Sequence, residues 1–227
     1  MKHPLDNPIY HALKSNHHHF SVGTENVRFY NREIAHFAGM KDYSEKDFEE
    51  LFQYADLEGV FIIFSPSAIE IPENWQLIRE IDMFQLVYEQ DTQPEGIKEI
   101  ELINLKENHV EEMIALVELT KPGPFLSKTI DLSNYTGVFN NGKLIAMAGH
   151  RFHANDYIEI SAVCTHPDHL GKGYAYEVIR EQVRRILEKS QIPFLHVRND
   201  NIGAVKLYQK LGFKIRIDMK AYVICKA

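Results

Sequence analysis

Two glycines in the segment HLGKGYA have the type and spacing to bind a phosphate group. They follow a predicted strand over residues 157–165, and a predicted helix begins at the second of them, Gly173. The first N–H groups of a helix have no partner within it and carry partial positive charge. Because Gly171 and Gly173 lack side chains, phosphate oxygens can approach this backbone, and Lys172 adds a cation. The segment predicts a site for a pyrophosphate-bearing cofactor.

Other interpretations of this segment are an ordinary glycine helix entry and two nucleotide motifs. A G-x-G turn alone is weak evidence for a ligand. A Rossmann fingerprint needs a third glycine close behind the strand, which this segment lacks. A Walker A loop needs Ser or Thr directly after the lysine, where Gly173 stands. Neither nucleotide motif fits.

Tyr208, in the later segment NIGAVKLYQKLGF, has two interpretations. On the predicted helix over residues 201–211 it forms an i, i+3, i+4, i+7 stripe with Ala204, Leu207 and Leu211, which favours a core position. A phenol beside a bound cofactor could also act as a proton donor. Periodicity alone favours the core.

Glu159 lies inside the predicted strand YIEISAVCT. Strand alternation places it on one face with Tyr157 and Ser161. An unpaired buried charge is costly, so this carboxylate needs a reason to be there. Burial would raise its pKa and make it a candidate base. The alternative is a structural carboxylate bonded to a neighbouring strand or to Arg151.

Cys164 is predicted to be a buried, inert thiol rather than an acyl-accepting nucleophile. Alternation places it on the other face of the strand, with Ile160 and Ala162, and no motif ties a histidine to it. His150 and His153 are weaker candidates for the site, since histidines on such strands are more often structural.

The glycine and tyrosine segments together resemble the GNAT superfamily of N-acetyltransferases. LGKGYA is similar to the family pattern [QR]-x-x-G-x-[GA], with Leu170 in place of Arg or Gln and with Gly173 and Ala175 at the fixed positions. The later segment is similar to the family's N-x-x-A-x-x-L-Y-x-x-L-G-F motif from Asn201 to Phe213. The resemblance covers about residues 135–220. More loosely, the two-lobed layout and the PGPF segment are similar to the glycine N-acyltransferase-like branch.

The resemblance implies that acetyl-CoA lies in a cleft where the strand over 157–165 splays from PFLHV. Backbone groups of Val163, Cys164 and Thr165 would pair with the pantetheine arm, and Asn201 would contact the cofactor. Tyr208 would protonate the leaving thiolate after direct attack by a neutral amine. The pyrophosphate would be held by the backbone of Leu170, Gly171, Lys172, Gly173, Tyr174 and Ala175.

The element pattern predicts an α/β protein whose mixed sheet has helices on its faces. Residues 96–227 are expected to form the GNAT domain in the order β-α-β-β-β-α-β-α-β-β, beginning with a strand at 97–103 and closing with FKIRID and AYVIC. Residues 1–95 are expected to form a smaller, degenerate α/β lobe without catalytic residues, with a helix after Ser44, the strand VFIIF, and then a turn, a short helix and a strand over 71–90.

Composition limits the partners. Residues 1–96 carry 7 Lys+Arg against 17 Asp+Glu, and residues 97–227 carry 18 against 15, which suits an anionic small ligand in the second part and disfavours nucleic acid. The chain has no apolar run that could span a bilayer and no visible secretory signal, and its two cysteines are expected to be reduced in the cytoplasm. The His17–His19 run predicts a polar loop rather than a metal site.

The sequence therefore predicts an acetyl-CoA-dependent N-acetyltransferase. Its acceptor, a small-molecule or peptide amine, is expected to enter between the PGPF segment, the predicted hairpin over 135–152 and the first lobe. The acidic first lobe mildly favours a cationic acceptor. The main alternative is a non-catalytic acyl-CoA-binding or sensor protein on the same fold, and a nucleotide-binding P-loop protein is a third. A homodimer is compatible with the sequence.

Overall fold

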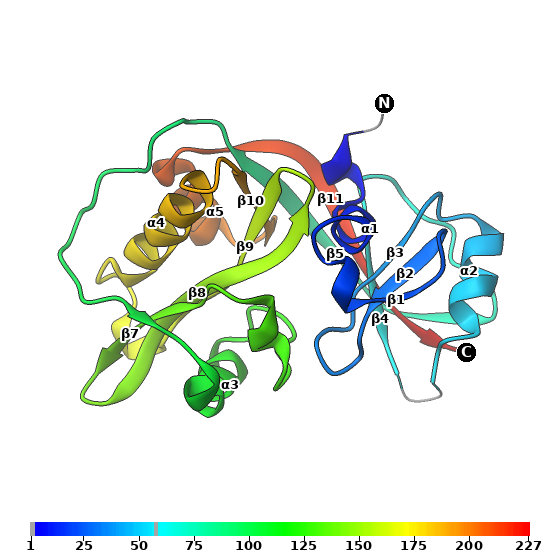
Figure 1. Cartoon of the computed structure of the whole chain (residues 1–227), viewed down its shortest axis with the longest axis horizontal. Coiled ribbons are helices and arrows are strands. Elements are labelled where there is room, and N and C mark those ends of the chain that lie inside the picture. The colour runs from blue at the N-terminus through cyan, green and yellow to red at the C-terminus, as the bar shows by residue number, and fades with distance from the viewer. Residues whose placement is uncertain (1–2, 57–58) are drawn as a thin grey trace.

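A mixed sheet organises the residues that the computed structural model describes, 3–56 and 59–227. Within them the model has a sheet of eight strands and a separate sheet of three (Figure 1). The large sheet runs, in spatial order, β4 (Phe61–Ser65), β11 (Phe213–Lys226), β5 (Trp75–Tyr88), β10 (Ile192–Arg198), β9 (Tyr157–Thr165), β8 (Lys143–Ala154), β7 (Thr136–Asn140) and β6 (Ile103–Asn104). The small sheet consists of β1 (Ser21–Gly23), β2 (Val27–Tyr30) and β3 (Ala38–Met40).

The helices lie on both faces of the large sheet and beside the small one (Figure 1). The α-helices are α1 (Pro8–Lys14), α2 (Glu45–Phe52), α3 (Val110–Thr120), α4 (Tyr174–Leu187) and α5 (Ile202–Leu211). Short 3-10 turns lie at η1 (Pro4–Asp6), η2 (His18–Phe20), η3 (Glu107–His109), η4 (Thr129–Leu132) and η5 (Pro167–His169). This mixed α/β architecture confirms the predicted fold class.

Strand β5 corrects the predicted order. Residues 71–90 contain no helix, because Trp75–Tyr88 form one long strand between β10 and β11. FKIRID and AYVIC are not two strands either, since both belong to β11, which pairs with β5 along its length. Local periodicity could not show this pairing, because strand preference depends on distant partners. A strand from the first part of the chain thus completes the sheet formed by the second.

The segment between β5 and β6 also differs from the prediction. Residues 97–102 form no strand, and only Ile103–Asn104 join the sheet. The backbone N–H groups of Ile97 and Lys98 instead donate to Oε1 of Glu177 on α4, at 2.7 and 2.9 Å. Because these donors are already paired with a fully buried carboxylate, the segment follows α4 around the outside of the molecule (Figure 1).

The predictions that rest on turns and caps are confirmed. Ser44 caps α2 in a capping box with Asp47, and α5 starts after Asn201, where the predicted helix begins. Asn141 and Gly142, at φ 50° and 74°, join β7 to β8 in a tight hairpin. These signals are local, so the sequence alone is sufficient to recognise them.

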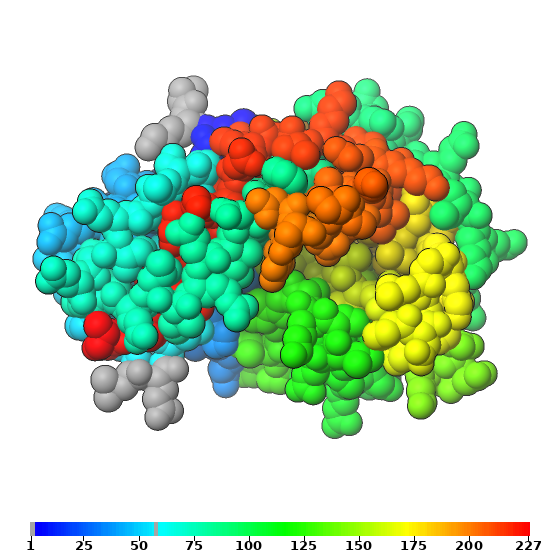
Figure 2. Space-filling model, turned by 180° about the vertical axis from the view of Figure 1, so that it is seen from behind, coloured from blue at the N-terminus to red at the C-terminus, as the bar shows by residue number. Residues whose placement is uncertain are grey.

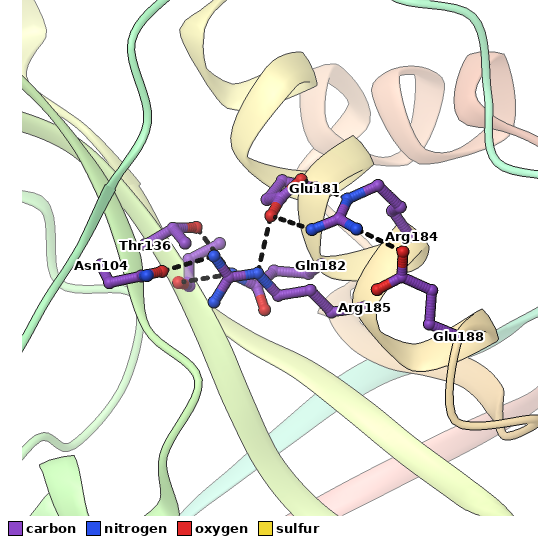
Figure 3. A network of polar contacts seen from close by, with 8 residues as sticks. Asn104, Thr136, Glu181, Gln182, Arg184, Arg185 and Glu188 are labelled. Carbon is purple, nitrogen blue, oxygen red and sulfur yellow. Dashed lines mark hydrogen bonds and ion pairs between the residues drawn. The ribbon is translucent and has the colours of Figure 1, made fainter.

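Polar side chains of helix α4 bond to β6, β7 and β8 at one edge of the large sheet (Figure 3). The buried amide of Gln182 donates to Oγ1 of Thr136 on β7 at 2.7 Å and to the carbonyl of Ala148 on β8 at 3.2 Å. Arg185 donates to Asn104 on β6 and to Glu181. A buried amide left without partners costs about 1–3 kcal/mol, so these bonds fix the position of α4 on the sheet.

Two faces of the sheet have separate cores. Helices α4 and α5 cover one face, over Leu86, Ile160 and Leu195. The segment at Leu5 and helix α1 cover part of the other face. Helix α3 packs beside Met147 and Cys164 in a third cluster. The site must therefore form where the helices leave the sheet uncovered.

Gly149 on β8 tests this packing. A Cβ there would lie 2.2 Å from the ring of buried Tyr135, so Gly149→Ala should lower the free energy of unfolding by about 1–3 kcal/mol. Gly203→Ala is the control, because a Cβ there meets no atom closer than 4.0 Å, and its effect should be neutral or slightly stabilising. Urea unfolding measures both, and equal stabilities would contradict the packing described.

Candidate active site

The sheet opens between β9 and β10. These neighbours are parallel and pair only at their beginnings, from Tyr157 with Ile192 to Glu159 with Phe194. Beyond this point β9 continues to Thr165 and β10 to Arg198 without pairing to each other. The backbone of residues 163–165 therefore faces an opening on its β10 side, as the predicted splay requires.

A bulge in β9 lies at this opening. Ala162 has φ 51°, and the pairing with β8 shifts between Gly149–Ser161 and Met147–Cys164. The predicted alternation is therefore wrong after Ser161: Cys164 does not share a face with Ile160, which packs under α4, but lies in the α3 cluster. Burial raises the pKa of the Cys164 thiol to about 11, which keeps it protonated and unreactive. Cys164 and Cys225 are both free thiols.

The glycine loop before α4 is open. Gly171 and Gly173 have φ 71° and 83°, and a Cβ at Gly171 would meet no atom within 4 Å. Gly173 is the N-cap of α4 and no side chain caps this end, so the first N–H groups are available to an anion. Leu170 is exposed, and Lys172 donates to the carbonyl of Asp168 at 2.8 Å. This backbone fits a pyrophosphate group.

A second cation lies beside the loop. The Nζ atom of Lys98 is 4.3 Å from the ring centre of Tyr174, the first residue of α4. Ile97 is the nearest neighbour of a Cβ built on Gly173. Sequence analysis did not include Lys98 and Ile97, because their contact with the loop depends on the course of the segment around α4.

Helix α5 brings Tyr208 to the same region. Tyr208 is 7% exposed and shares a core cluster with Val163 and Tyr174. Its ring packs 6.1 Å from that of Phe213, and its hydroxyl has no hydrogen-bond partner within residues 3–56 and 59–227. Burial and the nearby Cys164 raise its pKa above the ordinary value, so the phenol stays protonated. Asn201 uses its side-chain oxygen to cap α5 at Ala204.

The surface of the molecule has a hollow on the face opposite to the one seen in Figure 1. Figure 2 shows it between α5 in orange, the segment before α4 in yellow, and α3 in green. These are the elements that border the open end of β9. The hollow is thus in the position that a ligand reaching from the glycine loop to Tyr208 would need.

Glu159 is at the centre of a buried hydrogen-bonded chain. Arg151 donates to both of its oxygens, at 2.6 and 2.7 Å, and Nδ1 of His196 lies 2.6 Å from Oε1. Nε2 of His196 accepts from the Gln85 amide at 2.9 Å, and Oε1 of Gln85 accepts from Arg216 at 2.5 Å. Each of these residues comes from a different one of five adjacent strands, in the order β8, β9, β10, β5 and β11.

This pairing corrects the pKa expected of Glu159. Burial alone would raise that pKa, but the charge and hydrogen bonds of Arg151, with those of His196, outweigh it and hold it at about 2. Burial lowers the pKa of His196, so a neutral ring donates its Nδ1–H to the carboxylate. A carboxylate that accepts three hydrogen bonds is a poor base. The geometry matches the structural alternative considered above.

A small cavity lies beside the bulge, and we term it the acceptor cavity. Its volume is about 30 Å³. Three regions meet there: the PGPF segment, Arg151 of the β7–β8 hairpin, and Phe37 of the first lobe. It is lined by Ala35, Phe37, Val117, Pro122, Gly123, Pro124, Phe125, Thr129, Leu132, Tyr135, Arg151, Ser161 and Ala162.

Comparisons with known proteins identify the family. The model of FR47-like proteins matches residues 135–223. A solved GNAT-family structure from Novosphingobium aromaticivorans DSM 12444 is 30% identical to this chain, and the match covers 100% of both chains with a TM-score of 0.91. This chain is a member of the GNAT family.

Two further GNAT structures share the fold at low identity. A GCN5-related N-acetyltransferase from Kribbella flavida is 11% identical with a TM-score of 0.62, covering 96% of this chain and 95% of its own. An acetyltransferase from Colwellia psychrerythraea is 10% identical with a TM-score of 0.54, covering 88% and 84%. No curated protein matches this chain.

GNAT acetyltransferases use acetyl-CoA in general, and the glycine loop fits its pyrophosphate.

The described residues also bear on a metal site and on a membrane-spanning helix. Within residues 3–56 and 59–227 no group of three or more His, Cys, Asp or Glu side chains is placed to hold a metal ion. No helix in the described part of the chain is long and apolar enough to cross a membrane. Burial lowers the pKa of His150 to about 3, so this histidine is neutral.

Sequence analysis missed His196, Gln85 and Arg216, which extend the hydrogen-bonded chain from Glu159. His196 and Gln85 are polar residues within the apolar runs PFLHV and MFQLVY, the same signal that singled out Glu159. Applied to every predicted strand, that signal would have found both. Arg216 lies where β11 shifts its pairing with β5, which no local pattern shows.

The pairing of Glu159 sets a pH dependence of stability. Glu159→Gln leaves Arg151 without its counter-charge and should lower the free energy of unfolding at pH 7 by about 3–5 kcal/mol. A carboxylate whose pKa is depressed in the folded state contributes stability above its ordinary pKa of 4.5 and loses it as pH falls toward 2. The difference between wild type and variant should therefore shrink over that range.

Urea unfolding from pH 7 to pH 2 measures this difference. Glu118→Gln is the control, since Glu118 is exposed and the substitution changes the formal charge equally. Parallel curves for wild type and Glu159→Gln would show that the pairing is not the source of the stability.

Proposed function

We propose that this protein is an N-acetyltransferase that transfers the acetyl group of acetyl-CoA to a primary amine by direct attack in a ternary complex. One observation carries the proposal: the unpaired part of β9, the uncapped start of α4 and Tyr208 come together, since Tyr208 shares one cluster with Val163 of β9 and Tyr174 of α4. An open strand edge suits the pantetheine arm, and the helix terminus suits the pyrophosphate.

The roles follow from this placement. The backbone of residues 163–165 pairs with the pantetheine arm, and the backbone from Leu170 to Ala175 binds the pyrophosphate. The amine nitrogen attacks the thioester carbonyl, an N–C bond forms, the C–S bond breaks, and the thiolate takes a proton from Tyr208. Burial raises the pKa of Tyr208, so its phenol is protonated and can donate when the thiolate leaves.

Glu159 has a positioning role in this proposal. With its pKa at about 2 and three donors around it, it does not take the proton that the amine loses. The nitrogen releases that proton to solvent once the N–C bond has formed, and solvent returns a proton to the Tyr208 phenolate. Glu159 holds Arg151 and the paired beginning of β9 and β10, where the opening starts.

Gly171 tests the pyrophosphate site. Gly171→Ala adds a Cβ to a backbone at φ 71° and to the face that the anion approaches, so the KM for acetyl-CoA should rise about tenfold, the loss of one charge-assisted hydrogen bond. Gly142→Ala is the matched control, at φ 74° in the hairpin and with equally open surroundings. Both should lose similar stability, and only Gly171→Ala should lose cofactor affinity. Equal KM values would contradict the assigned site.

Tyr208 tests the chemistry. Tyr208→Phe keeps the packing and removes the proton donor, so kcat should fall about 100-fold while the KM for acetyl-CoA changes little. Tyr88→Phe is the control, because Tyr88 also packs on Phe213, at 5.2 Å, but lies at the end of β5. Thiol release with a panel of amines gives both constants. Acetyl-CoA binding without turnover of any amine would favour the non-catalytic acyl-CoA-binding alternative.

A further inference from the structure

The acceptor cavity has an unusual charge for a site that receives an amine. Among the described residues that line it there is no carboxylate, and Arg151 is its cation. The remaining lining is apolar except for the hydroxyls of Ser161, Thr129 and Tyr135. An acceptor is therefore not held here by an ammonium group.

The guanidinium of Arg151 is fixed and only partly used. Its Nε and Nη2 atoms donate to Glu159 at 2.7 and 2.6 Å. Its plane packs on Phe152 and Phe37, whose ring centres are 4.6 and 4.8 Å from Cζ. Nη1 has no acceptor within residues 3–56 and 59–227. Glu159 is fully buried and does not line the cavity, so Arg151 is the member of this ion pair that lines it.

Ser161 supplies a second donor at the same place. It belongs to the bulge of β9, next to Ala162, and it lines the cavity with Arg151. Thr129 is already occupied, since its hydroxyl donates to the carbonyl of Ile34 at 2.7 Å. Among the described residues, the Ser161 hydroxyl and Nη1 of Arg151 are thus two donors without an acceptor, on side chains that both line the cavity.

The size of the cavity limits what these donors can hold. Its volume of about 30 Å³ suits a compact group that takes the place of ordered water. A carboxylate is compact and planar, and is the partner that a guanidinium prefers.

We propose that Arg151, with Ser161, anchors a carboxylate on the acceptor, so that the acceptor class is amines that also carry a carboxylate, as amino acids do. This inference rests on the proposed function and narrows its acceptor. It replaces the mild expectation of a cationic acceptor, because the acidic residues of the first lobe do not line the acceptor cavity.

The first test uses the wild-type protein and matched acceptors. Free amino acids are compared with the corresponding amino acid amides, with acetyl-CoA saturating and thiol release as the readout. We expect kcat/KM for the free acids to be about tenfold or more above that for the amides, the value of one charge-assisted bond. The amides have the less basic amine, so intrinsic reactivity works against this result.

The second test uses Arg151→Lys. This variant keeps a cation beside Glu159, and its circular dichroism and melting temperature show whether it folds. The ratio of kcat/KM for the acids to that for the amides should fall toward one, because KM for the acid acceptor rises. KM for acetyl-CoA should stay within about twofold of wild type. Ser161→Ala, which leaves the ion pair intact, should reduce the preference in part.

Two results would overturn the inference: amides used as well as or better than acids by wild type, or an acid preference unchanged in both variants. A binding measurement separates this failure from failure of the proposed function. Calorimetry with CoA present compares N-acetyl amino acids with N-acetyl amino acid amides and needs no turnover. Preferential binding of the acids without acetyl transfer would support the carboxylate anchor and contradict the acetyltransferase function. Equal transfer to amides and acids would support the function and contradict the anchor.

Discussion

A single buried carboxylate constrains much of this structure. Glu159 is fully buried in the middle of the sheet, and a charge there is tolerated only with donors on all sides. Arg151 comes from the strand on one side and His196 from the strand on the other. Gln85 and Arg216 continue the bonds to β11, and each strand is thereby held in one register with its neighbours.

The opening between β9 and β10 begins where this chain of hydrogen-bonded side chains crosses the sheet. The pairing of β9 with β10 stops at Glu159, so the last paired residues are the ones that the side chains hold together. Beyond them the bulge at Ala162 turns β9 away from its regular course. The N-terminal segment lies at the β11 end of these bonded side chains. The backbone carbonyl of Leu5 accepts from Gln85 at 2.8 Å, and Asp6 pairs with Arg216 at 2.6 Å. The same side chains thus stabilise the sheet and set the boundary of the site.

Local signals in the sequence predicted the parts of the site that local structure makes. The glycine loop, the start of the helix at Asn201 and the hairpin at Asn141 depend on a few neighbouring residues, and each lies where it was expected. The insertion of β5 could not be predicted, because its partners β10 and β11 lie more than a hundred residues away in the chain. The pKa of Glu159 was predicted in the wrong direction for the same reason, since its sign depends on partners from two other strands.

The position of β5 has a consequence for how the chain reaches its folded state. During synthesis β5 emerges long before β10 and β11, the two strands that flank it. Until they arrive, its N–H and C=O groups have no ladder partners, and the large sheet cannot close. Strand β11 pairs with both β4 and β5 and is made after them, so these two strands must wait for it. Folding is therefore expected to be one late, cooperative event, during which β5 is the segment most exposed to wrong pairing.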